Sequence, residues 1–192
     1  MSLHIPPAPA AAERSVLAAL HPATPHLPHP LHVDRGALTP ALPLPLHRLL
    51  PAPSSGALPD ARLTGWRFLL ERGGRAVGAA ETMLTADGWA FSHFCEGPYI
   101  ASTERVVRLA ESLPDAYQPR LLSVPELYML TLWLHADVSA DPATGGPGPQ
   151  DLLVPLAPAP PGIAADQPMR VEALVPLMST RLAPAGPAAP VA

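Results

Sequence analysis

Two residues in one short segment, His93 and Cys95, could do chemistry together. They are two positions apart, and Trp89 and Phe91 continue the same spacing of every second residue. A strand would therefore place all four side chains on one face. An imidazole beside a thiol can lower the thiol's pKa and activate it as a nucleophile. Cysteine is nevertheless among the most buried residue types and is inert when buried, so we expect Cys95 to belong to the core.

Two further residues complete this candidate site. Glu81 lies in the middle of an expected strand, where an inward carboxylate could serve as an acid or base and an outward one would only be solvated. The solvated orientation is favoured, because carboxylates are rarely buried. Tyr99 follows the Gly97-Pro98 turn at the start of an expected helix. His93, Cys95, Glu81 and Tyr99 are therefore the candidate lining of a small-molecule pocket between a sheet and a helix.

A second pattern of chemical interest is the spacing of His26, His29 and His32. A residue every third position aligns along one edge of a polyproline II helix, and His-rich tracts can bind metals. Neighbouring imidazoles would start roughly 9 Å apart at about 3.1 Å rise per residue, too far to share one Zn²⁺. These three histidines are weak metal candidates, and no metal site or other cofactor is predicted.

The sequence lacks the residues and motifs of several enzyme classes. Lysine is absent, which excludes a phosphate-cradling Walker loop, a Schiff-base lysine and a Ser-Lys dyad. None of the patterns GxSxG, HExxH and GxGxxG occurs, and the single cysteine excludes a multi-cysteine zinc site. No catalytic residue is assigned, and the chain is expected to be a binding protein rather than an enzyme.

Charge and hydropathy indicate which partners to expect. The net charge is −4 and the 12 arginines are dispersed, so no basic stripe is present for nucleic acid. The longest strongly apolar run, from Leu127 to Leu134, is far shorter than the roughly 20 residues of a membrane-spanning helix. The N-terminus has neither a basic region nor a continuous apolar segment of a secretory signal, which predicts a cytoplasmic protein.

Aromatic residues and prolines divide the chain into three parts. All nine Phe, Trp and Tyr residues lie between Trp66 and Trp133, whereas 13 of the 29 prolines precede residue 61. Pro-dense segments without aromatics bury too little surface to offset chain entropy. We therefore predict a compact domain over 61–157, a Pro/Ala/His-rich disordered or extended segment over 1–60 with a short helix at 10–21, and a Pro/Ala-rich tail over 158–192 with a helix at 169–182.

Hydrophobic spacing predicts the elements of the central domain. Alternation over 63–70, 76–85 and 89–96 predicts a three-stranded meander, followed by a helix that Ser102 or Thr103 caps and that ends near Leu113. The segment 126–135 is either a strand or a helix. A strand is favoured, because 151–156 is a natural antiparallel partner for it. The Pro-rich segment 22–59 is predicted to contain neither a helix nor a central strand.

This element order predicts an α+β fold with an antiparallel sheet of about five to six strands and one main helix packed on it. It resembles the cystatin-like and NTF2-like architectures in element order alone, with no shared motif. The functional expectation is a non-catalytic protein-interaction or scaffold module with Pro-rich docking arms. The alternative is the small-molecule pocket described above, and a homodimer is also considered, because a strand as apolar as 127–134 needs cover or a neighbour.

Overall fold

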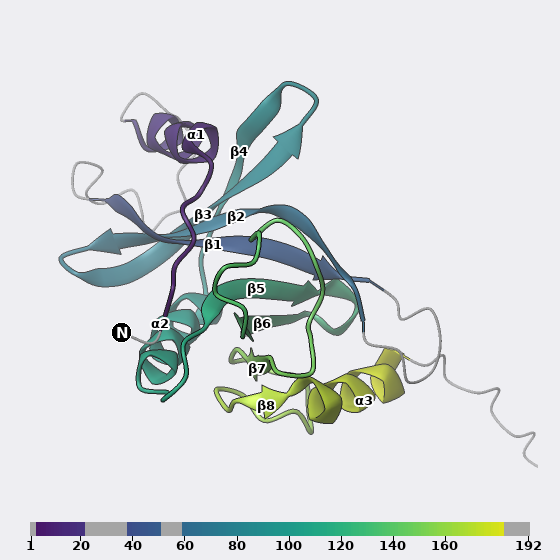
Figure 1. The fold of residues 1–192 in the computed structure, drawn as a ribbon. Helices are drawn as coiled ribbons and strands as arrows, with labels where there is room; N and C mark the ends of the chain where they lie inside the picture. The colour runs from purple at the N-terminus through teal and green to yellow at the C-terminus, as the bar shows by residue number, and fades with distance from the viewer. Residues whose placement is uncertain (1–2, 22–37, 51–58, 183–192) are drawn as a thin grey trace, which may run out of the picture.

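A computed structural model describes residues 3–21, 38–50 and 59–182 of the chain (Figure 1). Its elements are α1 (Ala10–Leu20), β1 (Thr39–Leu49), β2 (Ala61–Arg72), β3 (Arg75–Thr85), β4 (Gly88–Cys95), α2 (Pro98–Glu111), β5 (Gln118–Val124), the 3₁₀ turn η3 (Pro125–Leu127), β6 (Met129–His135), β7 (Leu152–Pro155), β8 (Met169–Arg170) and α3 (Val171–Leu182).

All the strands form one sheet of eight in the order β4-β3-β2-β1-β5-β6-β7-β8. Every neighbouring pair is antiparallel except β1 and β5, which run parallel. The predicted α+β class and the meander of β2, β3 and β4 are confirmed. The sheet is larger than the five to six strands predicted, and three α-helices pack on it within the described residues.

The main correction concerns β1, which lies at the centre of the sheet although its sequence is Pro-rich. The expectation that 22–59 contains no central strand is wrong here, since β1 pairs with β2 over its length and with β5 at its end. A bulge at Leu42 adds one residue, so that Pro40, Pro43 and Pro45 face alternate residues of β2. All three ring nitrogens therefore point to the same side. That side faces away from β2, so the prolines remove no hydrogen bond from the β1–β2 ladder. On that side β1 pairs with β5, but only from Leu46 to Arg48, beyond the three prolines.

Helices cover both faces of the sheet. Helix α2 packs over one face, where Val106, Val107 and Ala110 meet Leu44 and Leu121. Against the opposite face, α1 packs on β2, β3 and β4, with its most extensive contact on β4, and α3 packs on β5, β6 and β7. Both α1 and α3 lie outside the predicted 61–157 domain, and each contributes buried residues to a core. The predicted domain boundaries themselves stay a prediction.

Strand β6 resolves the ambiguity between strand and helix. It pairs with β5 on one side and with β7 on the other, as favoured from the sequence. Residues from Met129 to Leu134 are all buried. Both edges of β6 are paired and its side chains are buried within this chain, so its apolar character no longer requires a second subunit. The homodimer stays a prediction.

Helix α2 starts earlier than predicted. It begins at Pro98 after Gly97, whose φ of 102° favours glycine, and no side chain of the described residues caps it. Ser102 and Thr103 lie inside the helix instead of at its start. The Thr103 hydroxyl donates to the Tyr99 carbonyl, and the Ser102 hydroxyl donates to Asp166 at 2.6 Å.

Across the part of the chain that the structure describes, no helix is long and apolar enough to span a membrane.

Strands β2 and β3 approach each other closely at Gly65, and a substitution there tests this packing. A Cβ at Gly65 would lie 2.0 Å from the backbone oxygen of Thr82, a contact that no rotamer relieves. We expect Gly65→Ala to lower the free energy of unfolding by about 1–3 kcal/mol in a denaturant titration. The control is Gly148→Ala, whose Cβ would meet only the Asp151 carboxylate at 3.8 Å. Equal stability of the two variants would contradict the close packing of β2 against β3.

Candidate functional site

The β3–β4 hairpin holds three of the four residues predicted from the sequence. A bulge in β4 at Ser92 shifts the register, because Glu81 pairs with His93 while Thr82 pairs with Phe91. The expectation that Trp89 and Phe91 share a face with His93 and Cys95 is therefore wrong. Trp89, Phe91 and Phe94 pack on the α1 side, and Cys95 packs on the α2 side. The bulge thus separates the aromatic face from the polar one.

Glu81 lies in a row of polar side chains across three strands. Arg67 of β2 is opposite it in one ladder and His93 of β4 is opposite it in the other. Arg67 donates to Glu81 Oε1 from Nε at 2.7 Å and also from Nη2, and His93 Nε2 lies 3.6 Å from Glu81 Oε2. The Glu81 side chain is only 12% exposed. The expected solvated carboxylate is in fact a largely covered ion pair.

Cys95 completes the cluster next to Glu81. Burial raises the pKa of the Cys95 thiol to about 12, and the Glu81 carboxylate adds to the shift, because both disfavour the thiolate. The thiol is therefore protonated at neutral pH and is a weak nucleophile. The donor atoms of Glu81, His93 and Cys95 nevertheless lie within 4.8 Å of one another. This donor set suits metal coordination better than nucleophilic catalysis.

Tyr99 is placed elsewhere. Its hydroxyl donates to the carbonyl of Tyr128 at 2.6 Å and to that of Pro158 at 3.2 Å, so it ties α2 to the turn before β6 and to the chain after β7. Burial raises its pKa. The space between α2 and the sheet is filled by apolar side chains such as Val106, Leu121 and Leu132. The histidines His26, His29 and His32 lie outside the described residues.

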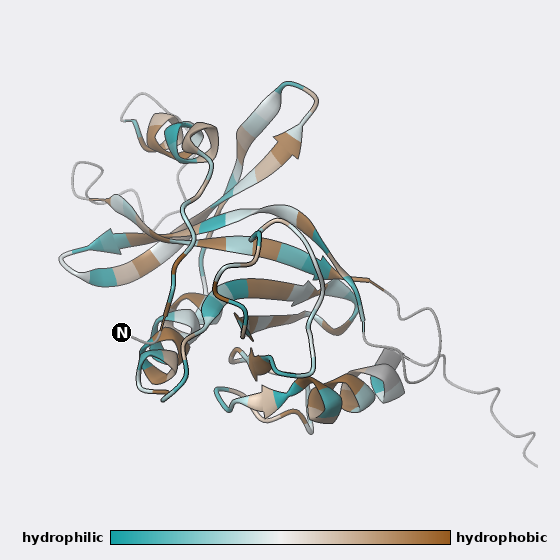
Figure 2. Cartoon of the chain, viewed as in Figure 1, coloured by the Kyte–Doolittle hydropathy of each residue, from teal (hydrophilic) through white to brown (hydrophobic). Residues whose placement is uncertain are grey.

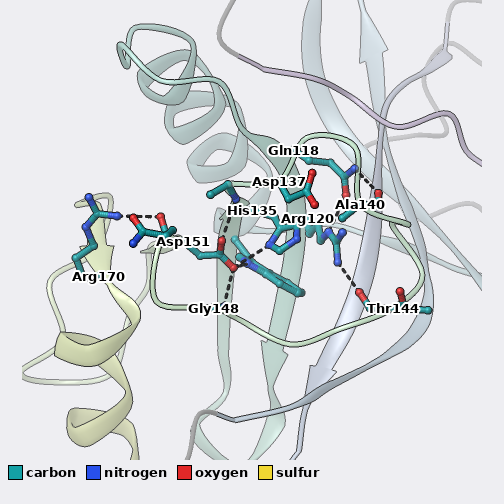
Figure 3. A network of polar contacts seen from close by, with 12 residues as sticks. Gln118, Arg120, His135, Asp137, Ala140, Thr144, Gly148, Asp151 and Arg170 are labelled. Atoms are coloured by element: carbon teal, nitrogen blue, oxygen red, sulfur yellow. Dashed lines mark hydrogen bonds and ion pairs between the residues drawn. The ribbon is translucent and has the colours of Figure 1, made fainter.

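A second polar cluster, which the sequence did not suggest, lies under the loop from Ala136 to Asp151 (Figure 3). Arg120 is fully buried and donates to Gln118 Oε1 at 2.8 Å, to the carbonyl of Thr144 at 2.8 Å and to that of Asp141 at 3.1 Å. Its guanidinium lies 4.7 Å from the centre of the Trp133 ring. Arg120 thus anchors the loop through backbone carbonyls.

Asp151 closes the other end of that loop. Its carboxylate accepts hydrogen bonds from His135 Nδ1 at 2.9 Å, Trp133 Nε1 at 2.7 Å, and the backbone N–H groups of Ala136 and Gly148. Burial alone would raise the pKa of Asp151, but these hydrogen bonds outweigh burial and lower it. The many hydrogen bonds that Asp151 accepts indicate a structural role in holding the loop.

His47 of β1 lies beside this cluster and is fully buried. Its ring meets Trp133 edge-on at 5.3 Å between centroids, and within the described residues neither ring nitrogen has a hydrogen-bond partner. Burial lowers the pKa of His47 to about 4, the Arg120 charge and His135 add to the shift, and the Pro45 carbonyl opposes it. His47 is therefore neutral in the folded protein at neutral pH.

One signal for this cluster is present in the sequence of β5. Gln118, Arg120 and Leu122 alternate along the strand, and an arginine inside an apolar strand indicates a buried anchor once both faces are known to be covered. Asp151 carries no such signal, because its partners come from β6 and from the loop.

Comparison with protein-family models, with curated proteins and with solved structures found no match for this chain. The likeness to cystatin-like and NTF2-like architectures therefore stays an expectation from element order.

His47 makes the stability of the protein sensitive to mild acid. Its folded pKa of about 4 lies below the ordinary value of 6.5, so the unfolded chain takes up a proton first as the pH falls. Stability is then lost progressively between about pH 6.5 and 4, by up to about 3 kcal/mol. We expect His47→Leu to flatten this part of the curve of unfolding free energy against pH. The loss of stability that comes from protonating Asp151, whose pKa is lowered, occurs at more acidic pH and should remain in the His47→Leu variant. An unchanged curve between pH 6.5 and 4 would contradict a neutral buried His47.

Proposed function

We propose that this protein is a non-catalytic interaction module that binds an extended segment of a partner protein along the outer edge of β4. The observation that carries the proposal is the character of β4. It is a terminal strand of the sheet, and no strand of the described residues pairs with its outer edge. Its sequence from Gly88 to Cys95 contains no Pro, Asp, Glu, Lys or Arg.

Such an edge is unusual, because terminal strands of soluble proteins carry charges, prolines or covers that prevent pairing with other chains. The opposite edge of this sheet follows that rule. Strand β8 has only two residues, one of which is Arg170, and α3 follows it directly. The contrast favours β4 as an edge that is kept available for strand addition.

The hairpin also offers apolar side chains to a bound segment. Met83 is 46% exposed and Leu84 is 62% exposed at the end of β3, opposite Ala90 and Trp89 of β4. In Figure 2 the brown, hydrophobic colour lies at the end of the β3 arrow, next to the paler turn of the projecting hairpin. Helix α1 packs on Trp66, Phe68 and Ala80 and also covers one face of β4 through Trp89, Phe91 and Phe94. The backbone edge of β4 is therefore presented by a strand that a helix supports on one face. Backbone pairing would supply affinity and these side chains selectivity.

The sequence-based proposal of Pro-rich docking arms has to be narrowed. Ala10–Leu20 packs on the sheet as α1, and Thr39–Leu49 is a central strand. These parts of the arms are used by the fold itself. The protonated thiol of Cys95 in the metal-free protein disfavours a cysteine nucleophile, and the apolar side chains packed beneath α2 disfavour a substrate pocket there. Both observations favour the binding module.

The test compares two variants that add the same charge in different places. The edge variant is Met83→Lys with Ala90→Lys, which places two lysines on paired residues beside the edge. The control is Leu177→Lys with Thr180→Lys on exposed positions of α3. The readout is quantitative mass spectrometry of proteins captured from an extract of the source cells, after melting curves show that both variants fold.

We expect the wild-type chain and the α3 control to enrich the same partner and the edge variant to lose it, with protection of β4 amides in hydrogen exchange upon binding. A partner retained by the edge variant, or absent with the wild-type chain, would contradict the proposal. A wild-type dimer in sedimentation velocity that only the edge variant abolishes would instead show that β4 pairs with a second copy.

A further inference from the structure

We propose that Glu81, His93 and Cys95 form a Zn²⁺ site on the α2-facing side of the β3–β4 hairpin, with a fourth coordination position open to solvent. This inference is independent of the partner bound at the edge of β4. It rests on the convergence of three different ligand types, one carboxylate, one imidazole and one thiol, whose donor atoms all lie within 4.8 Å of one another.

The strand register produces this convergence. Glu81 and His93 are direct partners across the β3–β4 ladder, and Cys95 lies two residues after His93 on the same face. The ligand atoms of a tetrahedral Zn²⁺, each about 2.0–2.3 Å from the ion, are roughly 3.5 Å apart. Movements of about 1 Å by side chains therefore complete the site, and the backbone ladder stays as it is.

Second contacts orient two of the ligands. Arg67 engages Oε1 of Glu81 through Nε and Nη2, which leaves Oε2 directed at His93. Ser92 Oγ lies 3.0 Å from Nδ1 of His93, so that Nε2 is the ring nitrogen that faces the cluster. Metal-binding histidines and carboxylates are characteristically held in this way by a partner on the other donor atom.

The charges around the site are compatible with a divalent cation. In the metal-free protein Glu81 supplies one negative charge, Arg67 supplies one positive charge and Cys95 is a neutral thiol. With Zn²⁺ bound, the Cys95 thiolate would supply the second negative charge. Binding breaks the S–H bond of Cys95, forms a Zn–S bond and releases one proton to solvent, with no change in oxidation state. The mixed N, O and S donor set suits Zn²⁺ better than the all-oxygen preference of Mg²⁺ or Ca²⁺.

The site is open on one side. The His93 side chain is 57% exposed, whereas Glu81 is 12% exposed and Cys95 is half-buried. An ion can therefore enter past His93 and exchange its last waters for the two deeper ligands. The exposed side leaves room for a bound water or for a donor from a bound partner, as in zinc sites with three protein ligands.

The test uses the full-length protein freed of metal with a chelator and then titrated with Zn²⁺ by calorimetry and with Co²⁺ by absorption spectroscopy. We expect one ion per chain and, with Co²⁺, a thiolate charge-transfer band together with visible bands of tetrahedral intensity. Cys95→Ser and His93→Ala should each weaken Zn²⁺ binding by about 100-fold or more, and Ser92→Ala by about tenfold through loss of His93 orientation.

The control for histidine binding elsewhere is the triple variant His26→Ala, His29→Ala, His32→Ala, which should bind as the wild type does. His93 is exposed enough that His93→Ala should keep the melting temperature of the metal-free protein, so a loss of binding there reports ligation. Zn²⁺ affinity unchanged in Cys95→Ser and His93→Ala, a Co²⁺ complex without the thiolate band, or binding lost in the triple variant would each overturn the proposal.

Discussion

The pairing of β1 with β2 on one side and with β5 on the other is the constraint on which the rest of the molecule depends. Strands β2, β3 and β4 form one antiparallel group, and β5, β6, β7 and β8 form another. Among the strands that the structure describes, only β1 joins the two groups through backbone ladders, and its Leu44 and Leu46 are buried under α2. Helix α2 adds a second link, because it packs on β3 of one group and on β6 of the other. The site on the hairpin and the polar cluster under the loop are therefore held in one continuous sheet by a strand of 11 residues.

Buried polar side chains hold the loops whose conformation apolar packing does not determine. Arg120 and Asp151 satisfy backbone groups of the loop between β6 and β7, and the Ser102 hydroxyl and Arg105 bind Asp166 in the segment after β7. These loops contain many Pro and Gly residues and have no regular ladder of their own, so side chains supply the missing partners. The β3–β4 hairpin has a different organisation, because its polar row of Arg67, Glu81 and His93 leaves donor atoms directed at one another.

Hydrophobic alternation is sufficient to predict β2, β3 and β4 and the pairing of β6 with β7, because each strand has a local period and a nearby partner. It fails for β1. The prolines Pro40, Pro43 and Pro45 argue against a central strand unless a bulge places all three on the same side of the strand. That bulge lies at Leu42, whose positive φ of 45° could not be predicted, because leucine is not a residue type that favours this conformation.

The candidate site shows the same limit. Residue type and spacing single out Glu81, His93 and Cys95, and the structure brings them together. Their surroundings could not be predicted, because Arg67 comes from a neighbouring strand and the bulge at Ser92 reverses the expected faces. Tyr99 is suggested by its proximity in sequence, yet its hydroxyl contacts carbonyl groups of Tyr128 and Pro158, far along the chain.

The most direct test of the central role of β1 is the unfolding of two shortened chains, one beginning at residue 38 and one at residue 50, followed by circular dichroism in denaturant. The chain from residue 38 loses α1 but keeps β1, and should unfold in one cooperative transition at a lower midpoint than the full chain. The chain from residue 50 loses the strand that joins the two groups, and should show no cooperative transition. A cooperative transition of the chain from residue 50 at the midpoint of the chain from residue 38 would contradict this view of the fold.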